Sequence, residues 1–227
     1  MTQIVEDEKR AAALAAVRAE VRPGMVVGLG TGTTARYVIE EIARLIRTEQ
    51  MPLRGVPSSI ATANLARSLG IPLVDLDLTV DVAIDGADEI DPRRNLIKGG
   101  GGAMTREKCV AVAARRFVVV ADASKLVARL SRPVPVEVLA FALPLVQRLL
   151  RERLPGCEPL VRRQLGGALF ITDNGNPVLD VTMPPECEPR VAADVLATIP
   201  GIVGHGYFLE MNPIVYVAGP DGVQTLS

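Results

Sequence analysis

Short apolar segments alternate with helical segments up to residue 121, and this alternation constrains the fold more than any other feature. The apolar run at residues 25–28 leads into a glycine- and threonine-rich loop and then into a helical pattern at residues 33–47. The same alternation continues with predicted strands at 53–56, 71–74, 80–84 and 117–121, and predicted helices at 59–69 and 105–116. It predicts an α/β fold with a mostly parallel, Rossmann-like open sheet flanked by helices.

The pattern changes after residue 131. Asp173-Asn174-Gly175-Asn176 predicts a hairpin turn between strands at 168–172 and 177–182, and helices are expected near 141–152 and 188–198. These elements predict a second, smaller α+β domain of the split βαβ, ferredoxin-like type.

The apolar run at residues 214–218 is too short to fold alone and is expected to return to the first sheet. We therefore predict a larger domain, residues 1–131 plus 206–227, and a smaller domain, residues 132–205. The smaller domain is a candidate oligomer interface.

Composition excludes several classes of partner. The net charge of −1 provides no long-range field that would attract nucleic acid or an anionic membrane surface. Cys109, Cys157 and Cys187 are far apart and lack metal-binding spacing, which argues against disulfides and structural zinc. The charged N-terminal segment, and the absence of an apolar run of about 18 residues, predict a cytoplasmic protein.

The loop at residues 28–35 is the first candidate binding element. Its glycines allow backbone N–H groups to approach an anion, the following helix adds its positive end, and three threonines add hydroxyl donors. A phosphate monoester suits this arrangement. A nucleotide is disfavoured because Thr33 stands where the dinucleotide fingerprint has its third glycine. The alternative is a glycine turn needed only for strand-helix packing.

An acidic cluster follows the strand at 80–84. Asp85 and Asp88 lie where ligands bind in open α/β sheets, at the carboxyl end of a strand. The spacing does not match a calcium loop and no histidine is nearby, so a metal site is disfavoured. Glu89 and Asp91 have an alternative interpretation as turn acids that cap the backbone.

Lys98 precedes four consecutive glycines, and Glu107 falls in the first turn of the next predicted helix. A run of glycines is entropically costly in an ordered segment, which indicates backbone that lies against a ligand; a flexible linker is the alternative. Glu107 is not in the position for a capping box, although dipole compensation could explain it. The single histidine, His205, is interpreted as structural.

Together these motifs resemble the type A ribose-5-phosphate isomerases. The resemblance is colinear over nearly the whole chain and rests on residues 28–34, 58–59, 85–90, 98–108, 121–125, 135–138 and 172–176. It implies interconversion of ribose 5-phosphate and ribulose 5-phosphate through a cis-enediolate, without a metal or another cofactor, in the pentose phosphate pathway. It also implies a homodimer or a homotetramer.

By position, the resemblance implies that Glu107 is the base that moves the proton between C2 and C1. Asp85 and Lys98, with Asp88 beside them, would assist ring opening and proton transfer between O1 and O2. The implied substrate-binding residues are Gly30, Thr31, Gly32, Thr33, Thr34, Asp85, Gly86, Asp88, Lys98, Gly99, Gly100 and Lys125, with the threonines on the phosphate. Arg10 aligns with a lysine that is often found in the first helix of such enzymes, so a contact with phosphate is implied there as well.

The chemistry of the reaction supports the roles of Glu107 and Lys98 independently of the resemblance. Removal of a proton next to a carbonyl creates an anion over two oxygens, so the reaction needs a base and a positive charge. Glu107 and Lys98 supply these groups.

Two alternatives remain open: a non-catalytic sugar-phosphate sensor domain, and an acyl or CoA transferase that forms a covalent glutamyl intermediate. The segment before Gly28 has room for one helix, which disfavours a helix-turn-helix regulator.

Overall fold

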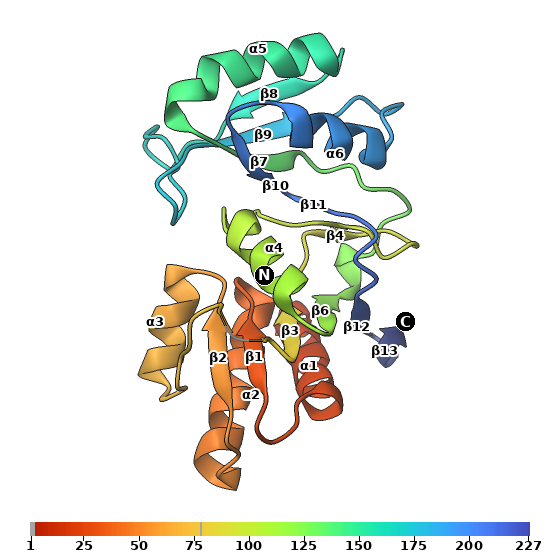
Figure 1. Ribbon diagram of the computed structural model, residues 1–227. Helices are drawn as coiled ribbons and strands as arrows, with labels where there is room; N and C mark the ends of the chain where they lie inside the picture. The colour runs from red at the N-terminus through yellow and green to blue at the C-terminus, as the bar shows by residue number, and fades with distance from the viewer. Residues whose placement is uncertain (1–2, 78) are drawn as a thin grey trace. The chain divides into compact units, whose positions relative to one another are not determined.

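A computed structural model describes residues 3–77 and 79–227, and these residues group into two units (Figure 1). The first unit runs up to Ala87 and also contains Arg106–Leu126 and Met211–Ser227. The second unit contains Asp88–Thr105 and Val127–Glu210. The chain therefore passes several times between the two units.

A six-stranded sheet forms the centre of the first unit, in the order β13-β12-β6-β3-β1-β2. Neighbouring strands pair in parallel, except for β12 and β13, which form an antiparallel hairpin at one edge. The strands are β1 (Val26–Leu29), β2 (Arg54–Pro57), β3 (Val82–Asp85), β6 (Phe117–Asp122), β12 (Ile214–Gly219) and β13 (Gly222–Leu226). The mostly parallel sheet, and the return of the last apolar segment to it, confirm the sequence-based predictions.

Helices cover both faces of this sheet. They are α1 (Gln3–Glu20), α2 (Thr33–Glu49), α3 (Ile60–Ser68) and α4 (Met104–Ala113), with a short 3-10 helix η1 (Ala123–Lys125) after β6. Val27 and Leu29 of β1 share a core with buried residues of α1 and α2. Gly28 lies between them on the opposite face, where an added Cβ would be 2.5 Å from Val110 of α4. The glycine thus allows α4 to approach the sheet closely.

Residues 71–74 do not form the predicted strand. Leu73 makes an isolated parallel bridge with Gly55, and Pro72 contributes only its carbonyl, which accepts from the Gly55 N–H. Because proline has no N–H, it interrupts the ladder that a longer strand would need.

The second unit contains the predicted smaller antiparallel sheet, in the order β10-β7-β9-β8. Its elements follow the βαββαβ sequence of a ferredoxin-like module. They are β7 (Val134–Val138), η2 (Ala140–Ala142), α5 (Leu143–Arg153), β8 (Glu158–Val161), β9 (Val178–Thr182), α6 (Pro189–Thr198) and β10 (Ile202–His205). A core beneath the helices joins Val136 of β7, Leu150 of α5 and Leu196 of α6, all fully buried.

The predicted hairpin turn forms, but only one of its flanking strands does. Gly175 N–H donates to the Thr172 carbonyl at 2.9 Å, which closes the turn. Residues 177–182 largely become β9, whereas residues 168–172 make only isolated bridges, at Leu169 and Ile171. The main partners of β9 are β7 and the unpredicted strand β8.

A three-stranded sheet also belongs to the second unit and consists of β4 (Glu89–Ile90), β5 (Leu96–Ile97) and β11 (Tyr207–Phe208). The second unit thus includes residues 88–105, 127–131 and 206–210 together with the smaller sheet. The predicted domain boundaries assign these residues to the larger domain. The physical reason is pairing across Gly206, whose carbonyl accepts from Lys98 N–H at 2.9 Å and whose N–H donates to Pro135 O at 2.7 Å.

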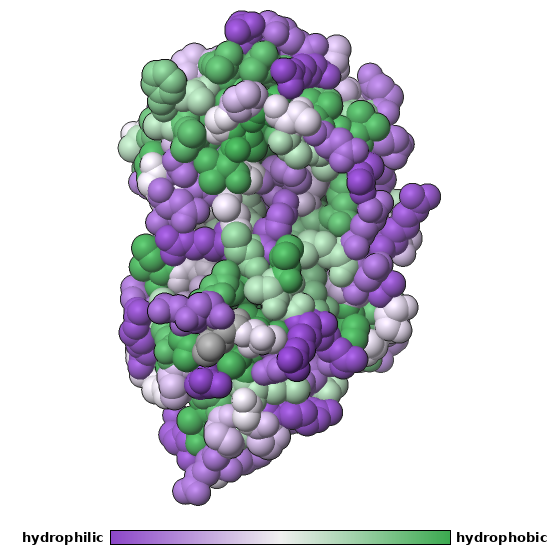
Figure 2. Space-filling model, in the orientation of Figure 1, coloured by the Kyte–Doolittle hydropathy of each residue, from purple (hydrophilic) through white to green (hydrophobic). Residues whose placement is uncertain are grey.

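Several large apolar side chains of the second unit are exposed. Phe141 is 99% exposed, and Leu139 and Leu145 beside it are 49% and 40% exposed. Hydrophobic atoms gather over the part of this unit that holds α5 on the face seen in Figure 2.

Among the helices of residues 3–77 and 79–227, none combines the length and apolarity needed to cross a bilayer.

Candidate active site

The loop after β1 leads into the N-terminus of α2. Gly32 precedes the helix with a φ of 108°, and it provides no side-chain cap for the first N–H groups of the helix. The first turn of α2 contains Thr33 and Thr34 and no acidic residue. Uncapped N–H groups, the positive end of the helix dipole and two hydroxyls form a suitable site for an anion.

Gly30 lies against Asp85, the last residue of β3. A Cβ at Gly30 would be 2.2 Å from Asp85 Oδ1, so only glycine fits there. Asp85 is 4% exposed, and its Oδ1 accepts from Thr31 N–H at 3.0 Å and from Gly86 N–H at 2.7 Å. The Asp85 carboxylate at the end of β3 therefore binds the loop that follows β1.

Thr31 is held by hydroxyls from the next strand and helix. Its Oγ1 lies 2.9 Å from Ser58 Oγ and 3.2 Å from Thr62 Oγ1. The Ser58 hydroxyl donates to Leu29 O and the Thr62 hydroxyl donates to Gly30 O, so the single hydroxyl hydrogen of Thr31 is directed at these two oxygens and donates to one of them at a time. Because its backbone N–H also binds Asp85, Thr31 directs its donors into the protein and positions the loop.

Glu107 is buried, with 6% exposure, in the first turn of α4. A carboxylate is favourable at this end of a helix. The next residue is also unusual, because burial lowers the pKa of the Lys108 ammonium from 10.5 to about 8. The start of α4 therefore contains a buried acid, Glu107, followed by a lysine whose pKa is lowered to about 8.

The second unit contains the other predicted catalytic residues. Lys98 is 3% exposed, and its Nζ lies 5.5 Å from the ring centroid of Phe208. Asp88 is half-buried, and its Oδ2 accepts from Gly100 N–H at 2.8 Å. The glycine run therefore forms an ordered turn that is tied to Asp88, which disfavours the flexible-linker interpretation.

The remaining acids of the cluster have structural partners. Glu89 accepts from Ser131 N–H at 2.7 Å and from Arg132 N–H at 3.1 Å. Asp91 Oδ1 accepts from the N–H groups of Arg93 and Asn95 at 2.9 and 2.8 Å. These contacts support the interpretation of Glu89 and Asp91 as turn acids.

Comparison with known proteins identifies the family. The family described as ribose 5-phosphate isomerase A (phosphoriboisomerase A) matches residues 54–222. The chain belongs to the ribose 5-phosphate isomerase A family. This result confirms the resemblance seen in the sequence motifs.

Relatives of this isomerase family match along nearly the full chain. Ribose-5-phosphate isomerase A of Roseiflexus sp. (strain RS-1) is 50% identical over 91% of this chain and 90% of its own length. The structure of ribose 5-phosphate isomerase A from Methanocaldococcus jannaschii covers 98% of this chain and 99% of its own, with 42% identity and a TM-score of 0.91. A D-ribose-5-phosphate isomerase in complex with phospho-erythronic acid covers 100% of both chains, with 36% identity and a TM-score of 0.93.

Two predicted residues of the family site lie at helix surfaces. Lys125 is half-buried in η1, which Asp122 caps by accepting from the Ser124 N–H at 3.1 Å. Arg10 is exposed, whereas its neighbour Lys9 is 4% exposed and pairs with Glu6 at 2.9 Å. Burial thus distinguishes Lys9 from Arg10, which the sequence pattern could not do.

Sequence reasoning also missed Thr62 and gave Asp122 no role. Thr62 lies in a predicted helix, α3. Its hydroxyl contacts the loop after β1, and the sequence does not reveal this contact because it depends on how the helix packs beside that loop. Asp122 is 1% exposed, and its Oδ2 has no hydrogen-bond partner among the residues that the structure describes. Its position at the carboxyl end of β6, in a motif already noted for the family, was the available signal.

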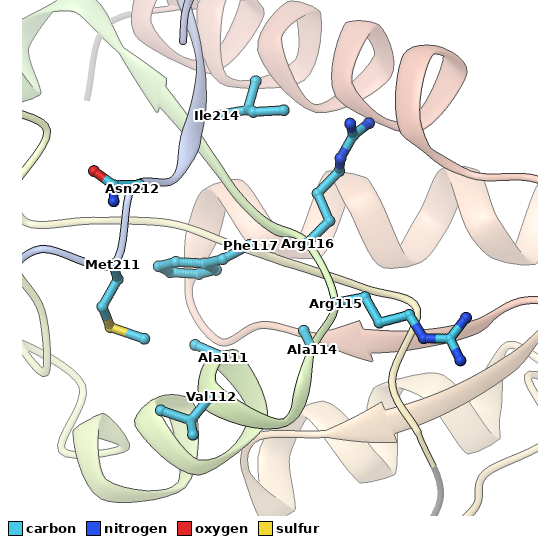
Figure 3. A pocket seen from close by; sticks show the side chains of 9 residues that line it. All are labelled: Ala111, Val112, Ala114, Arg115, Arg116, Phe117, Met211, Asn212 and Ile214. Carbon is cyan, nitrogen blue, oxygen red and sulfur yellow. The ribbon is translucent and has the colours of Figure 1, made fainter.

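A cavity of about 400 Å³ in the first unit lies among other residues (Figure 3). The residues that line it are Ala111, Val112, Ala114, Arg115, Arg116, Phe117, Met211, Asn212 and Ile214. None of these is acidic, and none is a predicted site residue. The Arg116 guanidinium pairs with Glu20 at 2.6 Å. This cavity therefore offers no base for proton transfer.

His205 has a structural environment in the second unit. It lies in β10 opposite Val136, with its ring edge-on to Tyr207 at a centroid distance of 6.3 Å. No cluster of three His, Cys, Asp or Glu side chains suited to a metal ion occurs within residues 3–77 and 79–227.

Proposed function

We propose that this chain interconverts D-ribose 5-phosphate and D-ribulose 5-phosphate by proton transfer through a cis-enediolate. The observation that carries the proposal is family membership over nearly the full length, at 50% identity to a named isomerase. The reaction belongs to the non-oxidative pentose phosphate pathway. It is an intramolecular oxidation and reduction of adjacent carbons, so it needs no external redox cofactor.

The substrate phosphate is assigned to the start of α2. The first N–H groups of this helix and the hydroxyls of Thr33 and Thr34 supply donors, and the helix dipole favours the dianion. Thr31, Gly30 and Gly32 shape the loop rather than supply the principal donors. Lys125 and Arg10 are assigned to outer contacts with the phosphosugar, and both assignments remain predictions.

The proton transfer is assigned to Glu107. A carboxylate base removes the C2 proton of the aldose, and the electrons of the C–H bond form the enediolate while negative charge develops on O1. The same group returns the proton to C1, which yields the ketose. Burial of Glu107 excludes water that would exchange or compete for this proton.

The developing oxyanion is assigned to Lys98, whose buried ammonium group supplies the positive charge that the enediolate needs. Asp85 and Asp88 assist ring opening and proton transfer between O1 and O2. Gly86, Gly99 and Gly100 contribute backbone groups to sugar binding. With an ammonium in the electrophilic role, the proposed mechanism includes no metal.

Incubation of the chain with ribose 5-phosphate in excess EDTA tests the function. Formation of ribulose 5-phosphate, followed by its absorbance or by NMR, supports the proposal. Saturable binding without ketose formation would instead indicate a sensor domain. A covalent glutamyl adduct formed from an acyl-CoA would indicate a transferase.

We further propose a cytoplasmic homodimer or homotetramer. Exposed Leu139, Phe141 and Leu145 of the second unit form an apolar surface that a second copy could cover. The free state of Cys109, Cys157 and Cys187 is consistent with a reducing compartment. Light scattering measures the assembly, and a monomeric mass would contradict it.

A further inference from the structure

Arg162 directly follows β8 and makes an extended set of hydrogen bonds. Its Nε and Nη2 donate to the two carboxylate oxygens of Asp180 at 2.9 and 2.5 Å. Its Nη1 donates to Gly99 O at 3.0 Å and to Gly100 O at 3.1 Å. The side chain is only 13% exposed, so solvent competes weakly for these donors.

The glycine run is held from its other side by Asp88. The Gly100 N–H donates to Asp88 Oδ2 at 2.8 Å, while the Gly99 carbonyl of the same peptide group accepts from Arg162. In a trans peptide the N–H and C=O groups point in opposite directions. Arg162 and Asp88 therefore hold one peptide plane from opposite sides and fix its orientation.

Phe170 supports the same turn. The Arg162 guanidinium lies 5.4 Å from the centroid of its ring, and the Phe170 N–H donates to Arg162 O at 3.0 Å. The ring also lies beside Gly102, where an added Cβ would be 2.3 Å from it. The segment between β8 and β9 thus contacts both ends of the glycine turn.

We propose that Arg162, oriented by Asp180, is a positioning residue for the isomerase reaction. It fixes the glycine turn and thereby the backbone of Lys98 and the carboxylate of Asp88. This inference rests on the proposed function, because it assigns to Lys98 and Asp88 their roles in the reaction. Arginine is required because one planar group must bind a carboxylate and two consecutive carbonyls, whereas the lysine ammonium presents its donors from a single point.

Arg162→Lys is the first test, because it keeps the charge. We expect kcat to fall by roughly 10- to 100-fold, the usual scale for a displaced catalytic group, with KM changed by less than about threefold. Arg148→Lys is the matched control, since Arg148 forms an exposed ion pair with Glu152 in the same unit and should retain wild-type kinetics. Unchanged kcat in Arg162→Lys would overturn the proposal.

Chemical rescue distinguishes positioning from a general effect on folding. A cavity of about 250 Å³ borders Arg162, Asp180, Asp88 and Gly100, so a small cation could reach the space left by Arg162→Ala. Millimolar guanidinium should restore several-fold of the lost kcat, and equimolar urea should not. Equal responses to both, or no response, would refute the positioning role.

Hydrogen exchange tests the clamp without reference to catalysis. A peptide that spans residues 98–102 should exchange faster in Arg162→Lys than in wild type, whereas exchange in α5 should be unchanged. Unaltered exchange at the glycine turn would overturn the clamp even if wild type proves to be an active isomerase. An inactive wild type with faster exchange in the variant would instead contradict only the proposed function.

Discussion

Replacement of Lys108 with methionine should stabilise the protein at neutral pH. Burial lowers the pKa of this lysine from 10.5 to about 8 in the folded state. A difference of one between the folded and unfolded pKa corresponds to about 1.4 kcal/mol, so the folded protein carries a cost of about 3 kcal/mol at pH 7 for keeping the ammonium charged. Methionine fills a similar volume without that charge.

The sign of the pH dependence is fixed by the lowered pKa. Between pH 8 and 10.5 the unfolded chain binds more protons at this lysine than the folded chain, so wild-type stability rises with pH in this window. The free energy of unfolding of Lys108→Met should therefore exceed that of wild type by about 3 kcal/mol at pH 7 and by less than about 1 kcal/mol at pH 10.

Urea unfolding at both pH values measures this difference directly. The control is Arg148→Met, which removes an exposed charge and should change the free energy of unfolding by less than about 0.5 kcal/mol at either pH. A Lys108→Met variant that is destabilised at pH 7, or that shows the same difference at both pH values, would refute the burial argument.

Two other substitutions test local parts of the site. Gly30→Ala should lower kcat/KM by at least about tenfold, because the new Cβ would displace the Asp85 carboxylate that holds the phosphate loop; initial rates at several substrate concentrations measure it. Glu137→Gln should destabilise the fold by about 2 to 4 kcal/mol at pH 7, because the fully buried carboxylate accepts from Thr105, Thr172, Asn174 and Asn176. Burial alone would raise the Glu137 pKa, but these bonds outweigh it and place the pKa below its usual 4.5, so the destabilisation measured by urea unfolding should shrink as pH falls below that value.

The sequence predicted the parts of the fold that depend on local patterns. Apolar runs next to glycine loops identified β1 and β3, and the parallel sheet followed from their alternation with helices. The contact between Asp85 and the loop after β1 was also predictable, since the carboxyl ends of parallel strands meet at one edge.

The parts that were missed depend on distant pairing. β8 contains Pro159 within Glu158–Val161 and has no clear alternation of apolar and polar residues, so its pairing with β9 gave no local signal. Arg162 reaches Asp180 and the glycine turn only because of that pairing. Burial likewise distinguishes Lys9 from Arg10, which is a property of the packed helix and not of the sequence pattern.

The central claim is that Glu107 transfers the proton between C2 and C1. Its most direct test is the turnover of ribose 5-phosphate by Glu107→Gln and by wild type, with product measured by NMR in deuterated water. We predict that wild type forms ribulose 5-phosphate and that Glu107→Gln loses about two to four orders of magnitude in kcat while KM stays within a few-fold. Turnover of Glu107→Gln near the wild-type rate would contradict this assignment.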